Sequence, residues 1–147
     1  MKIAIDVRMI DSFMHGLSRY AYNLIKGLSG IDTRNDYVLI ANNSFLNDFV
    51  SSRDNFSLEV TSLKLYGIRG QVLLPRLLKK KRIDIFHTPS FACPVYVSCK
   101  VIMTIHDMIH VLFQEDSSVV HKLYYNYIVR KAAEKASRII TVSENSK

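Results

Sequence analysis

Short runs of apolar residues alternate along this chain with segments whose apolar residues recur every three to four positions. The first run is KIAIDV at residues 2–7, and the segment after it carries apolar residues at helical spacing: Leu17, Tyr20, Ala21, Leu24, Ile25 and Leu28. The change of period predicts a strand followed by an amphipathic helix.

The same alternation continues to the end of the chain. Further strands are expected at residues 37–41, 56–63, 83–87, 100–106 and 138–143. Helices are expected at about residues 70–81 and 118–136, with a shorter one near 44–50. The helix at 70–81 places four leucines on one face, Leu73, Leu74, Leu77 and Leu78. It tolerates Pro75 only if this residue lies in the first turn, because proline lacks the N–H that a helix interior needs.

Most of the expected strands are apolar on both faces, and the last one is also expected to be buried. Such strands, joined by amphipathic helices, predict a parallel sheet covered on both sides. The fold class is therefore α/β, a three-layer Rossmann-like domain with a twisted parallel sheet that spans residues 1–147 as one domain. Ligands of such sheets collect beyond the carboxyl ends of the strands. The loops after Val7, His87, His106 and Val142 are the candidates.

Composition fits one globular domain. The chain has 147 residues, 48% of them hydrophobic, and lacks an apolar run near the length of a membrane span or a secretory leader. These features predict a cytoplasmic protein. The two cysteines, Cys93 and Cys99, are then expected to be reduced thiols.

Positive charge is concentrated in one run. The net charge is +7, and residues 76–82 read RLLKKKR. The five cations are Arg76, Lys79, Lys80, Lys81 and Arg82. They could contact an anionic membrane from the cytoplasmic side, or they could be the solvated end of a helix. Nucleic acid is not expected, since no aromatic residue interleaves the run to stack on a base.

The stretch TIHDMIH sets His106 and His110 four positions apart with Asp107 beside the first. Two histidines at this spacing can bind zinc on a helix, but here a strand runs directly into His106, so no metal is expected. His106 and Asp107 leave the carboxyl end of a strand, where an imidazole can hydrogen-bond a ligand hydroxyl. The alternative is a histidine satisfied by backbone groups, with Asp107 capping a turn.

Two other loops are candidates. Gly16 lies between the first strand and the first helix, where a glycine lets the backbone approach a phosphate at a helix amino terminus. A glycine of an ordinary tight loop is the alternative. At the end of the chain, Ser143 and Glu144 follow the last strand. They either face a ligand or cap a following helix.

Taken in order, several stretches resemble the amino-terminal domain of retaining glycosyltransferases of family 4, also called group 1, which have the GT-B architecture. These stretches are MKIAIDVRMI, HGLSRYAYNLIKGLSGID, YVLIA, LLPRLLKKKRIDIFHTPSF, VIMTIHDMI and YYNYIVRKAAEKASRIITVSENSK. The resemblance implies transfer of a sugar from a nucleotide sugar to a saccharide or lipid-linked acceptor, with retained configuration and without an essential metal or other cofactor.

The resemblance also implies roles for individual residues. Gly16 and Leu17 would lie near the donor diphosphate, and His106 would hydrogen-bond the transferred sugar, with Asp107 beside it. The acceptor side would be lined by His87, Thr88, Ser143 and Glu144. Many members have a second glycine where this chain has His15.

The family's second Rossmann domain, which holds most of the nucleotide-sugar site, is not found in these 147 residues. The chain is thus expected to be one half of a GT-B enzyme, inactive alone and completed by a carboxyl-terminal domain in cis or in trans. The alternative is a non-catalytic binding or scaffold domain that docks to an anionic lipid surface or to a partner subunit.

Overall fold

The computed structural model describes residues 1–106 and 124–142, and every structural statement below concerns these residues. They form a six-stranded sheet in the order β3-β2-β1-β4-β5-β6. The strands are β1 (Lys2–Asp6), β2 (Asp36–Ala41), β3 (Phe56–Val60), β4 (Ile85–Thr88), β5 (Lys100–Ile105) and β6 (Arg138–Thr141). All neighbouring pairs are parallel, and Ala4 of β1 lies between Val38 and Phe86.

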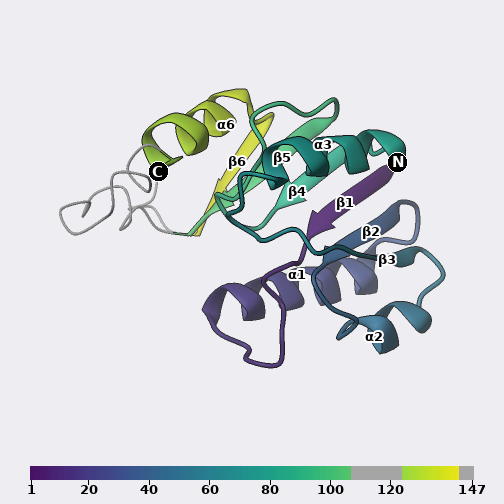
Figure 1. The fold of residues 1–147 in the computed structure, drawn as a ribbon. Coiled ribbons are helices and arrows are strands. Elements are labelled where there is room, and N and C mark those ends of the chain that lie inside the picture. Colours follow the sequence, from purple (N-terminus) through teal and green to yellow (C-terminus); the bar gives the residue numbers. More distant parts are fainter. Residues whose placement is uncertain (107–123, 143–147) are drawn as a thin grey trace.

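Helices cover both faces of this sheet (Figure 1). The helices are α1 (Gly16–Ile31), α2 (Asn47–Ser51), α3 (Gly70–Lys80), the π-helix η1 (Tyr124–Val129) and α6 (Arg130–Lys135). Helices α1 and α2 lie on one side and α3 and α6 on the other (Figure 1). The three-layer α/β arrangement with a parallel sheet confirms the fold class predicted from the sequence.

Each face of the sheet has its own hydrophobic core, because successive residues of a strand point to opposite sides. Ala4 and Phe86 pack with Leu74 and Leu78 of α3. Ile5 lies on the other face with Ala21 and Ile25 of α1, among other residues. Alternate residues of a strand therefore pack against the helices on opposite faces of the sheet.

Two strand predictions need correction. The strand expected at 56–63 ends at Val60, and Leu63 is buried in the core from the loop that follows. The last strand was expected to be buried, but among the described strands it pairs with β5 alone, at the edge of the sheet, and it is mostly exposed. Ile139 and Ile140 of β6 are 46% and 41% exposed.

Helix α3 confirms the expected span closely but contradicts the placement of Pro75. With the helix beginning at Gly70, Pro75 lies in the second turn, so its missing N–H leaves one carbonyl without a helical donor. The expected helix at 118–136 appears as η1 followed by α6, which ends at Lys135, while residues 118–123 lie outside the described part.

The end of α3 is a Schellman motif formed without glycine. The N–H of Ile83 donates to the carbonyl of Leu78, and the N–H of Arg82 donates to that of Lys79. Arg82 occupies the left-handed region with φ 54°. This motif ends the helix and directs the chain into β4.

Candidate functional site

The candidate site lies at the carboxyl rim of the sheet, where the loops after β1, β4 and β5 emerge. The strand order reverses between β1 and β4, and this is where ligands of doubly wound sheets collect. His106 follows directly after Ile105, the last residue of β5.

The imidazole of His106 is half-buried, and Pro89 and Tyr20 are among the residues that contact it. Its Nε2 lies 3.1 Å from the carbonyl oxygen of Pro89, in the loop after β4. The ring of Tyr20 meets it edge-on, with centroids 4.5 Å apart and an interplanar angle of 86°. An edge-to-face pair of this kind is a favourable aromatic geometry. The ring is therefore positioned at the rim and is not enclosed in the core.

Tyr20 also connects this histidine to the start of α1. It lies four residues after Gly16, which is one helical turn, and its side chain reaches β5. The hydroxyl of Tyr20 lies 3.5 Å from Thr104 Oγ1. The amino terminus of α1 and the end of β5 are consequently on the same rim, although Gly16 and His106 are far apart in sequence.

Gly16 is exposed and opens α1 with His15 as the N-cap residue, which makes no side-chain capping bond. A Cβ on Gly16 would meet no atom of the described residues within 4 Å. Leu17 packs partly against the core under α1. The side chain of Ser18 donates to the carbonyl of Met9 and thereby fixes the loop after β1 to the helix.

His87 lies beneath the rim. Its Nε2 is 3.0 Å from Thr104 Oγ1, and the side chains of both residues are buried. Burial lowers the pKa of His87 to about 4, so the ring is neutral near pH 7. A neutral imidazole hydrogen-bonded inside the protein supports the rim from below, without itself lining it.

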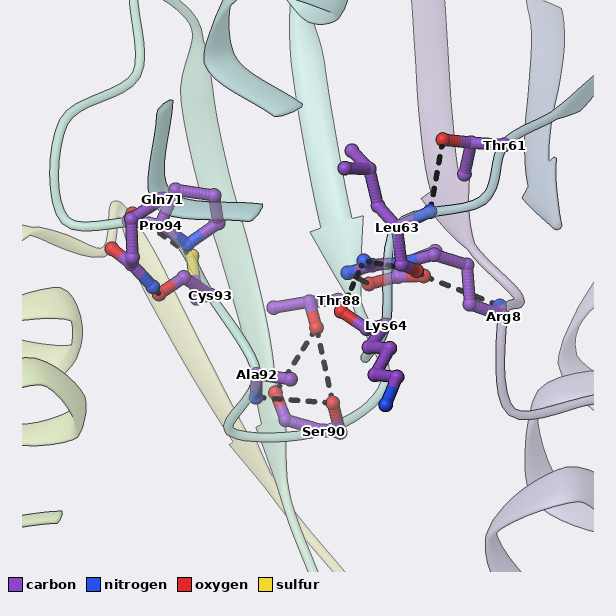
Figure 2. A network of polar contacts seen from close by, with 11 residues as sticks. Arg8, Thr61, Leu63, Lys64, Gln71, Thr88, Ser90, Ala92, Cys93 and Pro94 are labelled. Carbon is purple, nitrogen blue, oxygen red and sulfur yellow. Dashed lines mark hydrogen bonds and ion pairs between the residues drawn. The ribbon is translucent and has the colours of Figure 1, made fainter. Parts of the chain in front are cut away.

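Thr88 is also buried, as is the turn that follows it. Thr88 Oγ1 donates to the carbonyl of Ser90 and lies 3.3 Å from Ser90 Oγ, which accepts from the N–H of Ala92. Figure 2 shows these contacts at the end of β4. They fix the first turn of the loop that carries Pro89.

A buried ion pair stands at the end of β1. Arg8 Nη2 and Nε lie 2.7 Å and 2.8 Å from the two carboxylate oxygens of Asp6. Arg8 Nη1 also donates to the carbonyls of Leu63 and Lys64, at 3.2 Å and 3.1 Å (Figure 2). The pair therefore ties the loop after β3 to the central strand of the sheet.

The loop after β4 has a second attachment, at α3. Gln71 Nε2 donates to the carbonyl of Cys93, and its Oε1 accepts from the N–H of Val95, at 3.3 Å and 3.0 Å. Figure 2 shows Gln71 beside Cys93 and Pro94. The amide side chain of Gln71 thus hydrogen-bonds one carbonyl and one N–H of this loop.

Asp107, Ser143 and Glu144 lie outside the described residues, so their predicted places at the site are not observed. Both cysteines are free, as expected, and burial raises the pKa of the Cys93 thiol to about 12. Within residues 1–106 and 124–142, no three His, Cys, Asp or Glu side chains are grouped to hold a metal. No helix in this part of the chain is long and apolar enough to cross a bilayer.

Sequence reasoning missed the residues that organise this rim. Tyr20 was assigned to the apolar face of a helix, and Thr104 to a buried strand. The sequence does contain indications of them. Thr104 carries a hydroxyl within a run of apolar residues, and Asp6 and Arg8 interrupt another apolar run. Polar side chains in buried positions require partners, and here they find one another.

Comparison with known proteins identifies the family of this chain. The profile of glycosyltransferase family 4 matches residues 14–147. The chain belongs to this family, which confirms the resemblance seen in the sequence. No curated protein sequence matches the chain.

Two solved structures are similar in fold. A glycosyltransferase from Rickettsia africae ESF-5 aligns over 97% of this chain with 12% identity and a TM-score of 0.46. A dTDP-glucose 4,6-dehydratase from Bacillus anthracis str. Ames, in complex with NAD, aligns over 75% of this chain with 9% identity and a TM-score of 0.46. The chain spans 42% and 39% of the length of these two proteins.

Proposed function

We propose that this chain is the acceptor-side domain of a retaining glycosyltransferase. The reaction would move a sugar from a nucleotide sugar to a saccharide or lipid-linked acceptor. Membership of glycosyltransferase family 4 supports the transferase class. The observation that carries the assignment is the contact between Tyr20 and His106, which brings the start of α1 and the end of β5 to one rim.

The donor diphosphate would lie at the amino terminus of α1. The first N–H groups of a helix have no partner within the helix, and the helix dipole adds positive potential there. Gly16 and Leu17 begin this 16-residue helix. Their backbone N–H groups would hydrogen-bond the phosphates. Gly16 is exposed and has no side chain, so it would not obstruct the approach of the diphosphate.

His106 would hydrogen-bond a hydroxyl of the transferred sugar, with Asp107 following it. In a retaining transfer, positive charge develops on the sugar while the diphosphate leaves, so groups arranged beforehand around both lower the barrier. One rim supplies one wall of such a site. A second Rossmann-like domain, in cis or in trans, would supply the other wall, and the isolated chain would be inactive.

The acceptor would approach over the loop after β4 and the end of β6. Because His87 and Thr88 are buried, their proposed part is to shape the loop that carries Pro89. Ser143 and Glu144 remain proposed contacts of the acceptor at the end of the last strand.

A contact with the cytoplasmic face of an anionic membrane is a further part of the proposal. Four of the five cations at 76–82 are exposed, namely Arg76, Lys79, Lys80 and Arg82. Lys81 is less available, since its Nζ lies 2.6 Å from Glu59. Pelleting with vesicles that contain anionic lipid tests this contact. Wild-type protein should sediment, a variant with Lys79 and Lys80 neutralised should not, and wild-type protein left in the supernatant would exclude the contact.

Sugar transfer by the chain with and without a donor-binding domain tests the main proposal. Hydrolysis and transfer are measured with nucleotide sugars, for the isolated chain and for the chain joined to or mixed with such a domain. Transfer should require both parts. Robust turnover by the isolated chain would refute a half-site, and a lack of transfer by every combination would favour a non-catalytic binding domain.

A further inference from the structure

The hydrogen bond between His106 and Pro89 fixes the tautomer of the imidazole. A backbone carbonyl can only accept, so Nε2, at 3.1 Å from the Pro89 oxygen, carries the hydrogen. In the neutral ring, Nδ1 is then the acceptor. The bond also ties the orientation of the ring to the position of the loop after β4.

Three polar side chains support this ring from α1, β5 and β4. Thr104 Oγ1 lies 3.5 Å from the hydroxyl of Tyr20 and 3.0 Å from Nε2 of His87. Thr104 has one hydroxyl hydrogen, so it can donate to one of these neighbours while accepting from the other. Because Thr104 is fully buried and His87 nearly so, water does not compete for these bonds.

The same chain of contacts fixes the ring that touches His106. The Tyr20 hydroxyl is anchored over Thr104 while the body of its ring packs against the imidazole. Rotation of Tyr20 would break both contacts at once, and rotation of His106 would also break the bond to Pro89. The geometry therefore restricts the imidazole from two sides.

We infer that Tyr20, Thr104 and His87 are positioning residues that hold His106 in one orientation and one tautomer, with Nε2–H on Pro89. That this ring meets the transferred sugar rests on the proposed function. The positioning itself does not, and it can be measured on this chain without any substrate.

Nitrogen NMR of the chain labelled with ¹⁵N-histidine tests the inference at about pH 8, where an ordinary imidazole is neutral. Nε2–H should exceed Nδ1–H at His106 by about tenfold or more, the factor one intact hydrogen bond supports. Tyr20→Leu and Thr104→Val should move this ratio toward that of free histidine. Thr104→Ser, which keeps the hydroxyl, should restore it.

Tyr22→Leu is the matched control, since Tyr22 lies on the same helix but packs near Phe49. It should leave the His106 signals unchanged. If Thr104→Val does not fold, Tyr20→Phe carries the test, because it removes only the hydroxyl and should still lower the ratio. A wild-type ratio equal to that of free histidine, or one unchanged in Tyr20→Leu and Tyr20→Phe, overturns the inference.

The NMR result and the transfer assay fail independently. A fixed tautomer together with an undiminished transfer rate for His106→Ala would leave the positioning intact and remove the proposed role in transfer. A mobile ring together with a loss of transfer in His106→Ala would refute the positioning and leave the proposed role in transfer intact.

Discussion

Arg8 and Asp6, two residues apart at the end of β1, form a two-point ion pair whose side chains are 1% and 0% exposed. Removing one partner of such a pair leaves a buried charge without compensation. The same arginine holds two carbonyls of the loop after β3. This pair should therefore matter for stability as well as for the shape of the rim.

Arg8→Met, which nearly preserves volume, should lower the free energy of unfolding by about 3–5 kcal/mol. Urea denaturation followed by circular dichroism measures this change. Arg130→Met is the control, because the Arg130–Glu134 pair is 76% and 58% exposed and should contribute less than about 0.5 kcal/mol. A loss below about 1 kcal/mol for Arg8→Met would show that the buried pair does not stabilise the fold.

The neutral His87 predicts a loss of stability in mild acid. Its pKa is about 4 in the fold, against 6.5 for an ordinary histidine, so the unfolded chain binds more protons between these values. Stability should thus fall by about 2–3 kcal/mol as the pH drops from about 7 to 4, from this residue alone. His87→Gln, whose amide can hydrogen-bond Thr104 but does not titrate, should show a shallower decline. Equal slopes for the two proteins would mean that His87 is not held neutral.

Arg82 should be replaceable by glycine with a gain in stability. At φ 54°, a residue with a Cβ is strained and a glycine is not. Arg82→Gly should raise the free energy of unfolding by about 0.5–1 kcal/mol, measured by thermal denaturation. Lys80→Gly, in the last helical position, is the matched control and should lower it. A lower melting temperature for Arg82→Gly would indicate that its side chain stabilises the fold more than its backbone strains it.

Gln71 predicts a specific change in hydrogen exchange. The N–H of Val95 donates to Gln71 Oε1, so Gln71→Ala should raise the exchange rate of this amide by about tenfold, the effect of losing one hydrogen bond. Val72→Ala is the control, because Val72 is the next residue and is exposed, and it should leave the exchange rate of the Val95 amide unchanged. Unchanged protection of Val95 in Gln71→Ala would mean that other contacts hold the loop after β4.

The sheet was predictable because buried parallel strands have a strong apolar pattern. KIAIDV and KVIMTIH each contain a strand of the structure, and YVLIA lies within a third. The end of β3 was not predictable. Leu63 is apolar and buried but lies in a loop, and an apolar residue alone does not distinguish a buried loop from a strand. The exposure of β6 depends on its position at the edge, which a local pattern does not report.

The candidate site was predictable only in outline. Strand order places His106 at the carboxyl rim, and the sequence suggested this place. His87 was expected to line the acceptor side, but it follows Phe86 of the α3 face, so its side chain points under α1 to Thr104. The links from Tyr20 to His106 and from Arg8 to Leu63 join distant segments, and no spacing within one segment indicates them.

The most direct test of the account is the transfer rate of His106→Ala in the assembly with a donor-binding domain. Loss of a hydrogen bond to the reacting sugar should lower kcat by about tenfold to a hundredfold, while circular dichroism and the melting temperature stay close to wild type. A folded His106→Ala protein that transfers sugar at the wild-type rate would contradict the claim that this rim binds the transferred sugar.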